Sequence, residues 1–342
     1  MPPGTRGLPG NAPVLNEPGP VAGEGTSLRA EDIAQPADDA PPAETITADV
    51  DGAAISAIAA PSPERLDRAY TIILDAGHGG SDTGAIANRI VERESNLDFA
   101  RRVEEILVAQ GHRVVQTRVD GGRSVLYPDE ETIPQIAESR IDLQARVDLA
   151  NQEGGDVFVS IHSNLSSTNS FERGVEVWFD PNRPHSEANF RLSVNLLTQV
   201  IAELFEFGYP VFNRQIHSDE CHSVEPGLNI CLPLFVLGPP ATLDRQRVVA
   251  AGIDPDRFAF AEGEDVLMTR ATEMPAALVE LLVLSNPGDS AILRSDAARQ
   301  AIARGIARAI VEFLDNEESR VEETDSTDLG LPIDSDEVAQ VD

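Results

Sequence analysis

Between Tyr70 and Leu314, short runs of apolar residues alternate with longer segments that have helical periodicity. Buried strands are predicted at 70–75, 113–117, 156–161, 174–179 and 276–284, and helices at 95–110, 139–151, 187–205 and 296–314. Such alternation places helices over both faces of a sheet. The sequence therefore predicts an α/β fold: a single three-layer domain with a twisted, mostly parallel or mixed sheet and helices on both faces.

The segments that flank this region differ from it in composition. All Phe, Trp and Tyr residues lie between Tyr70 and Phe313, whereas 1–69 is rich in Pro, Ala and acids and 316–342 is rich in acids. Segments with so little apolar mass cannot offset their ordering entropy. We therefore expect a disordered linker at 1–69, a folded domain at 70–315 and a disordered acidic tail at 316–342.

Charge excludes several classes of partner and mechanism. The net charge is −32, which disfavours nucleic acid and anionic lipid surfaces as partners. Every basic residue is Arg, so mechanisms that need a lysine amine are excluded. The sequence contains no run of about 18 apolar residues, the length that would predict a membrane-spanning helix. The first residues also lack the apolar stretch of a signal peptide, so we expect any export signal to be missing from this sequence.

Two histidines and one glutamate stand where predicted strands end. His78 lies between glycines just after the first strand, and His162 directly follows the third. Alone, each histidine is compatible with a turn or a structural role. At one edge of a sheet, however, two imidazoles form most of a catalytic zinc site, which needs three protein ligands. A carboxylate is the third ligand we expect.

Glu280 is the one charged residue in the apolar run 276–284. An unpaired buried carboxylate is costly, so it pairs with an Arg or has a chemical function. The functional interpretation is a general base beside a metal.

Several short blocks, in order, resemble those of the zinc-dependent N-acetylmuramoyl-L-alanine amidases that cut bacterial peptidoglycan (amidase type 3). The resemblance covers 70–205 and 266–314. The blocks are Asp75-Ala76-Gly77-His78-Gly79-Gly80, Glu92-Arg93-Glu94-Ser95-Asn96-Leu97, Thr117-Arg118 with 143–151, Ser160-Ile161-His162-Ser163-Asn164, and 274–280 with Ser285-Asn286-Pro287.

The resemblance implies a function and a site. It implies hydrolysis of the amide between the lactyl group of N-acetylmuramic acid and L-alanine, with Zn2+ as cofactor and peptidoglycan as substrate. It also implies His78, Glu92 and His162 as zinc ligands and Glu280 as the catalytic carboxylate that takes a proton from the attacking water. Glu94 is the alternative to Glu92.

Other polar residues near the same edge carry weaker expectations. Asn164 and Arg270 are candidate substrate contacts, and Arg118 is expected to pair with an acid. Leu282-Val283 stands where the family usually has Gly-Phe, which bears on the shape of the substrate pocket.

Residues 206–265 are rich in Pro, Gly and Asp and have no clean periodicity, so we expect a functional insertion. Cys221 and Cys231 lie in it. A disulfide, free thiols and, with His217 and His222, a second zinc site are the alternatives. In some relatives such an insertion covers the zinc and is moved by an activator, so a protein activator acting on 206–265 is a further hypothesis.

The resemblance places the protein outside the cytoplasm, in the periplasm, in the cell wall or secreted. Two alternatives stay open: a zinc peptidase that cuts another amide, and a catalytically silent wall-binding or regulatory homologue.

Overall fold

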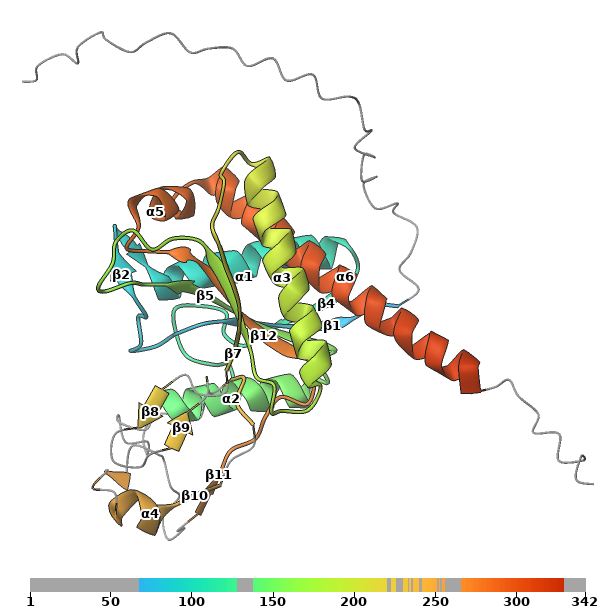
Figure 1. Cartoon of the computed structure of the whole chain (residues 1–342). Coiled ribbons are helices and arrows are strands. Elements are labelled where there is room, and N and C mark those ends of the chain that lie inside the picture. Colours follow the sequence, from blue (N-terminus) through green and yellow to red (C-terminus); the bar gives the residue numbers. More distant parts are fainter. Residues whose placement is uncertain are drawn as a thin grey trace, which may run out of the picture. The chain divides into compact units, whose positions relative to one another are not determined.

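The computed structural model describes residues 68–127, 138–219 and 266–328, with parts of the segment between them at 223–225, 230–232, 234, 236–239, 242–250, 252 and 254–255. Its centre is a six-stranded sheet in the order β4-β1-β5-β12-β6-β7 (Figure 1). The strands are β1 (Thr71–Ala76), β4 (Arg113–Gln116), β5 (Val157–Asn164), β6 (Val175–Phe179), β7 (Asn213–Ser218) and β12 (Ala276–Val283).

Strand direction makes the sheet mixed. β1 runs parallel to β4 and β5, and β12 runs parallel to β5. β6 is antiparallel to β12 and parallel to the edge strand β7. The carboxyl ends of β1, β5 and β12 therefore meet at one edge of the sheet, which is where ligands bind in open α/β sheets.

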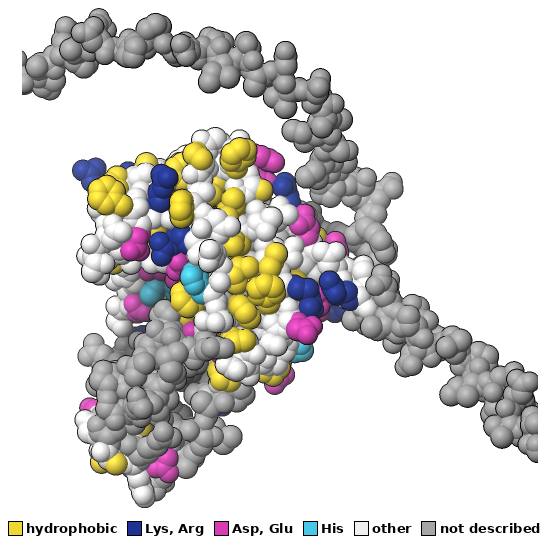
Figure 2. All heavy atoms as spheres, in the orientation of Figure 1, with side chains coloured by type: hydrophobic (Ala, Val, Ile, Leu, Met, Phe, Trp, Pro, Cys, Tyr) yellow, Lys and Arg dark blue, Asp and Glu magenta, His cyan; other side chains and the backbone are white. Residues whose placement is uncertain are grey.

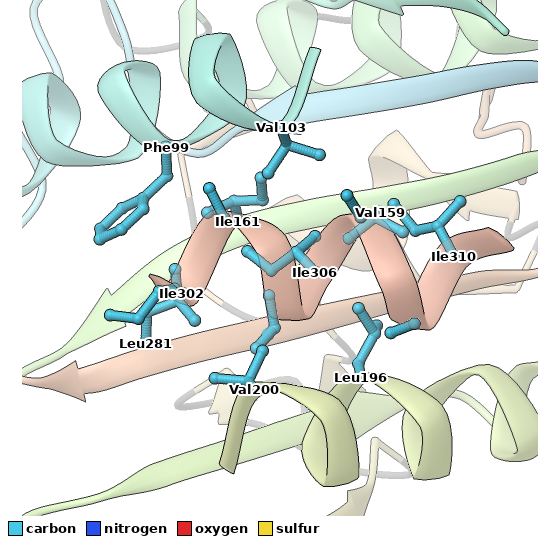
Figure 3. Close-up of a cluster of buried hydrophobic side chains, with 14 of the residues drawn as sticks. Phe99, Val103, Val159, Ile161, Leu196, Val200, Leu281, Ile302, Ile306 and Ile310 are labelled. Atoms are coloured by element: carbon cyan, nitrogen blue, oxygen red, sulfur yellow. The ribbon is translucent and has the colours of Figure 1, made fainter. Parts of the chain in front are cut away.

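Helices cover both faces, which confirms the predicted α/β fold. The larger core cluster joins the sheet to α1 (Glu92–Ala109), α3 (Ser186–Glu206) and α6 (Asp296–Asp328). Figure 3 shows Phe99, Ile306 and Val200 of these helices gathered over β5 and β12. A smaller cluster joins the opposite face to α2 (Glu138–Gln152) through Val147 and Ala150.

Successive side chains of β5 point to opposite faces of the sheet, which determines the face on which His162 lies. Val159 and Ile161 belong to the cluster under α1 and α6, whereas Phe158 belongs to the cluster under α2. His162, four residues after Phe158, therefore lies on the α2 side. Glu280 lies on that side too, because Leu278 packs in the α2 cluster two residues earlier.

Shorter elements complete the domain. They are β2 (Ile86–Ala87), β3 (Ile90–Val91), β8 (Ser223–Glu225), β9 (Ile230–Leu232), β10 (Thr242–Asp244), α4 (Arg245–Ala250), β11 (Val266–Met268) and α5 (Pro287–Leu293). The expectation that 206–265 is an insertion without periodicity needs correction at its start. β7 belongs to the central sheet, and its Ile216 packs against the larger core cluster.

The carboxyl-terminal helix is longer than predicted. α6 continues to Asp328, so the expectation of disorder from residue 316 is wrong for 316–328. The helix is tied back to the domain: Arg191 donates to Glu317 at 2.6 and 2.7 Å, and the Tyr70 hydroxyl donates to Asp315 at 3.1 Å and Glu318 at 2.8 Å. Residues 1–67 and 329–342 lie outside the described residues, and so do the side chains of Cys221 and Cys231.

The outer side of α3 is partly apolar. Figure 2 shows hydrophobic side chains along this helix, and Phe190, Val194 and Phe205 are exposed there. Within the described part of the chain, no helix combines the length and the apolar character that crossing a bilayer requires.

Candidate metal centre

The loop after β1 holds His78 in a strained conformation. Its φ is +65°, in the left-handed region that residues with a Cβ rarely adopt. The neighbouring Gly79 has a φ of +148°, and a Cβ there would lie 2.4 Å from the carbonyl oxygen of Gly122. This backbone projects the imidazole of His78 beyond the edge of the sheet.

Two fully buried arginines, Arg146 and Arg118, donate hydrogen bonds to the backbone of the loop that carries His78. Arg146 donates to the carbonyl oxygens of Ala76 at 2.8 Å and His78 at 2.6 Å. Arg118 donates to the carbonyl oxygens of Ala76 at 2.7 Å and Gly77 at 3.0 Å. The expected ion pair of Arg118 with an acid is therefore replaced by bonds to backbone carbonyls.

Asp75, at the end of β1, compensates one of these buried charges. Its carboxylate lies 2.8 Å from Arg146 and accepts hydrogen bonds from Thr117 and Ser160, both at 2.6 Å. Burial acts to raise the pKa of Asp75, but Arg146 and the two hydroxyl donors outweigh it and hold the pKa below its usual value. Asp142 completes the pairing of Arg146 at 2.6 Å.

Glu92 brings the two histidines together from the first residue of α1. Its Oε1 lies 3.0 Å from Nε2 of His78 and 3.2 Å from Nδ1 of His162. The same oxygen accepts from the backbone N–H of Ser163 at 3.1 Å, and Oε2 accepts from the N–H of Ala85 at 2.8 Å. The buried carboxylate is thus held by the backbone while it faces both imidazoles.

These three residues suit a divalent metal ion. One potential ligand atom from each of His78, Glu92 and His162 lies within 4.8 Å of the others, and no second such group exists among the described residues. Two imidazoles and a carboxylate are the donor set of one class of catalytic zinc site. Asp82 accepts a hydrogen bond at 2.9 Å from Nδ1 of His78, an arrangement that directs Nε2 toward a metal.

Electrostatics agree with a cation site. Burial lowers the pKa of His78, but hydrogen bonds with Asp82 and Glu92 outweigh it and raise the pKa to about 9. Burial likewise acts to raise the pKa of Glu92, yet the contacts with His162 and His78 hold it well below its usual range. The group therefore favours positive charge at its centre.

Glu280 is placed beside this group by strand register. It pairs with His162 of β5 on one side and with Glu176 of β6 on the other. Its Oε2 atom is buried without a hydrogen-bond partner among the described residues. Burial, together with the like charges of Glu92 and Glu176, raises the pKa of Glu280 well above its usual range. A carboxyl group of this kind is suited to taking up a proton.

The other candidates from the sequence have partners of their own. Arg270 forms a two-point ion pair with Asp148 on α2. Glu94, the alternative ligand, is more than half exposed and pairs with Arg93 at 2.8 Å. Asn164 pairs with Val283 and donates to Glu176, the residue of β6 that pairs with Glu280, at 2.6 Å.

Glu176 is a polar residue of this edge that sequence reasoning missed. It is buried, and its Oε2 accepts from Arg214 of β7 at 2.6 Å. The signal available was a single acid within the otherwise apolar run 175–179, the pattern that identified Glu280.

A pocket opens beside the candidate ligands. His78 and His162 line it, together with Leu143 of α2. Leu234 and Val236, which belong to the segment 206–265, line it as well. Part of this segment therefore lies against the approach to the histidines.

Comparison with known proteins identifies the family of the chain. The family model for N-acetylmuramoyl-L-alanine amidase matches residues 72–312. The chain is 36% identical to the amidase LytC of Bacillus subtilis over 110 residues, which is 32% of this chain and 18% of LytC. It is 26% identical to AmiA of Escherichia coli over 246 residues, 71% of this chain and 75% of AmiA.

A solved structure shares the fold. The CwlD amidase from Clostridioides difficile, in complex with the GerS lipoprotein, superposes with a TM-score of 0.52 at 21% identity. The superposition covers 72% of this chain and 98% of CwlD.

Proposed function

Because the chain belongs to the N-acetylmuramoyl-L-alanine amidase family of enzymes, we propose that it is a zinc-dependent hydrolase of bacterial peptidoglycan. The bond cut is the amide between the lactyl group of N-acetylmuramic acid and L-alanine. The observation that carries this proposal is the convergence of His78, Glu92 and His162 at the sheet edge where Glu280 stands in register.

The zinc ligands of the proposal are His78, Glu92 and His162. When bound, zinc supplies a Lewis acid that polarises a carbonyl and lowers the pKa of water. Asp82 fixes the ring orientation of His78 through its 2.9 Å hydrogen bond, and Arg146 holds the backbone of the same residue. These contacts preorganise the ligand set, so little reordering accompanies metal binding.

Glu280 is the proposed proton carrier. Its unpartnered Oε2 accepts a proton from the attacking water, and the carboxyl group returns that proton to the amine of L-alanine as the amide breaks. Glu176 stays outside this transfer because Asn164, Trp178 and Arg214 occupy its oxygens.

Product analysis tests the proposal. Zinc-loaded protein and its Glu280→Gln variant are incubated with purified muropeptides, and the products are identified by mass spectrometry. We expect a free lactyl carboxylate on muramic acid and a new L-alanine amino terminus with the wild type only. Cleavage between two amino acids would instead indicate a peptidase, and stoichiometric zinc without any hydrolysis would indicate a silent homologue.

The segment 220–265 is proposed to restrict access to the site until a protein partner displaces it. The lining of the histidine pocket by Leu234 and Val236 supports this, and the relative CwlD is itself solved with a partner, the GerS lipoprotein. A test is to replace 220–265 with a short Gly-Ser linker, which spares strand β7. Turnover of a soluble muropeptide should rise; unchanged or lost turnover would count against restriction.

The proposed place of action is extracytoplasmic, in the periplasm, the cell wall or the medium. This follows from the substrate, because peptidoglycan lies outside the cytoplasmic membrane.

A further inference from the structure

The hairpin that leads into α1 has an unusual tip. Ala87 of β2 pairs with Ile90 of β3, which leaves Asn88 and Arg89 as a two-residue turn. Both have positive φ, +46° and +65°. Asn suits the first position of such a turn, but the second is usually Gly, because a Cβ is disfavoured there. Residues held in such conformations cluster at ligand-binding sites.

The tip is fixed in place from two sides. The side-chain amide of Asn88 donates to the carbonyl oxygen of Leu284 at 2.8 Å, just after β12. Arg294, at the end of α5, donates to the carbonyl oxygen of Asn88 at 2.9 Å. Arg89 and Arg294 line one pocket, with Ser95 of α1 and Leu293 of α5. Hairpin, α1 and α5 lie together in Figure 1.

The pocket has uncompensated positive charge. Two other charged side chains line it, and both are paired: Glu94 with Arg93 at 2.8 Å, and Arg299 with Asp98 at 2.5 Å. Within the described ranges, neither Arg89 nor Arg294 forms an ion pair with an acid. In a chain with 58 acids and 26 basic residues, two guanidinium groups that line one pocket and form no ion pair there mark a site for an external anion, since Glu94, the acid in the lining, pairs with Arg93.

We propose that this pocket binds a carboxylate of the peptide that begins with L-alanine in the substrate, an inference that rests on the proposed function. The peptide carries at least its terminal carboxylate. Arg89 lies three residues before Glu92, so their Cα atoms are at most about 11 Å apart. An extended peptide of three residues has a similar length, so a substrate peptide that starts near Glu92 is long enough to reach Arg89.

The test compares two substrates and three variants. The substrates are muramoyl tripeptides with free carboxylates or with all peptide carboxylates amidated, and the variants are Arg89→Ala, Arg294→Ala and the control Arg113→Ala. Arg113 begins β4, at the opposite edge of the sheet, and pairs with Glu153. For the free acid, KM should rise about tenfold in each pocket variant with kcat unchanged, as expected for one lost charge-assisted hydrogen bond.

The control variant and the amidated substrate should show no such change. Equal KM values of the wild type for both substrates, or a loss in Arg113→Ala as large as in Arg89→Ala, would overturn the inference.

Binding of the free tripeptide to metal-free protein keeps this inference separate from the proposed function. Calorimetry should give weaker binding to Arg89→Ala than to the wild type, whether or not any amide is cut. Identical binding to both would overturn the carboxylate site. Inorganic phosphate serves as a second probe: if it binds the wild type as tightly as the peptide does, the pocket is a general anion site and the proposal fails.

Discussion

Replacing Arg146 by Met should destabilise the protein in a way that depends on pH. The guanidinium is fully buried, as is the carboxylate of Asp75, and the two lie 2.8 Å apart. Without Arg146, Asp75 is either a buried unpaired charge or takes up a proton. Breaking one side of a buried pair typically costs about 3–5 kcal/mol.

Protonation limits that cost. At pH 7, protonating an aspartate with an ordinary pKa near 3.9 costs about 1.4 kcal/mol for each pH unit between the two values. The free-energy cost at Asp75 therefore cannot exceed about 4 kcal/mol. At pH 5 the same reasoning gives about 1.5 kcal/mol. In the wild type the lowered pKa of Asp75 gives stability that is present above the unfolded pKa and is lost only as pH falls through the folded value. The part of the deficit that comes from Asp75 should therefore shrink by more than half between pH 7 and pH 5, whereas the lost bonds to the carbonyl oxygens of Ala76 and His78 cost the same at both pH values.

Urea unfolding of metal-free protein at both pH values measures the deficit. Arg270→Met is the matched control, because it removes an exposed ion pair with Asp148, which lies on the same helix as Arg146. Its loss should lower the free energy of unfolding by less than about 1 kcal/mol. A deficit that is equal at pH 5 and pH 7, or no larger than that of the control, would refute the buried-charge reasoning.

The remaining predictions concern the metal centre. Glu280→Gln should keep stoichiometric zinc and lose about 100- to 10,000-fold in kcat, the range of general acid–base catalysis; near-normal turnover contradicts the role. In metal-free protein, His78 has a pKa of about 9 and therefore holds a proton at pH 7. Because zinc must displace this proton, zinc affinity should rise about tenfold per pH unit up to pH 9. Competition with a chelator measures the affinity, and a value that does not change with pH contradicts the prediction. The same raised pKa gives stability below the unfolded histidine pKa that is lost as pH rises through about 9. Gly77→Ala should abolish stoichiometric zinc, because its Cβ would lie 2.1 Å from Nε2 of His162, whereas Gly121→Ala, with 3.6 Å to its nearest neighbour, should retain it.

The sequence predicted the centre of the fold well because buried strands and amphipathic helices carry strong patterns. It missed β7, since Asn213–Ser218 contains one apolar residue, Ile216, and its place at the sheet edge comes from packing. It also ended α6 too early, because the helix beyond residue 314 is acidic and is held by partners far away in sequence, Tyr70 and Arg191.

For the site, residue type and strand position carried the information. His78, His162 and Glu280 stood out by lying at or near strand ends, and the structure brings them to one edge with Glu92. Roles that depend on which residues meet in three dimensions could not be predicted. Arg118 donates hydrogen bonds to backbone carbonyl oxygens, and Arg270 forms an ion pair with Asp148. Arg89 gave no signal, because its proposed role rests on a turn conformation and on a pocket that only the folded chain forms.

The contact between Tyr70 and Glu318 affects where the domain can be joined to another protein or to a solid support. It brings the beginning of the first strand and the last helix to one place, about 20 Å from His78 along the six residues of β1. A circular permutant that joins residue 320 to residue 68 through a short linker therefore needs no rearrangement of the sheet. A fusion partner or a solid support fixed at this junction leaves the sheet edge that holds the candidate metal ligands at the far end of β1.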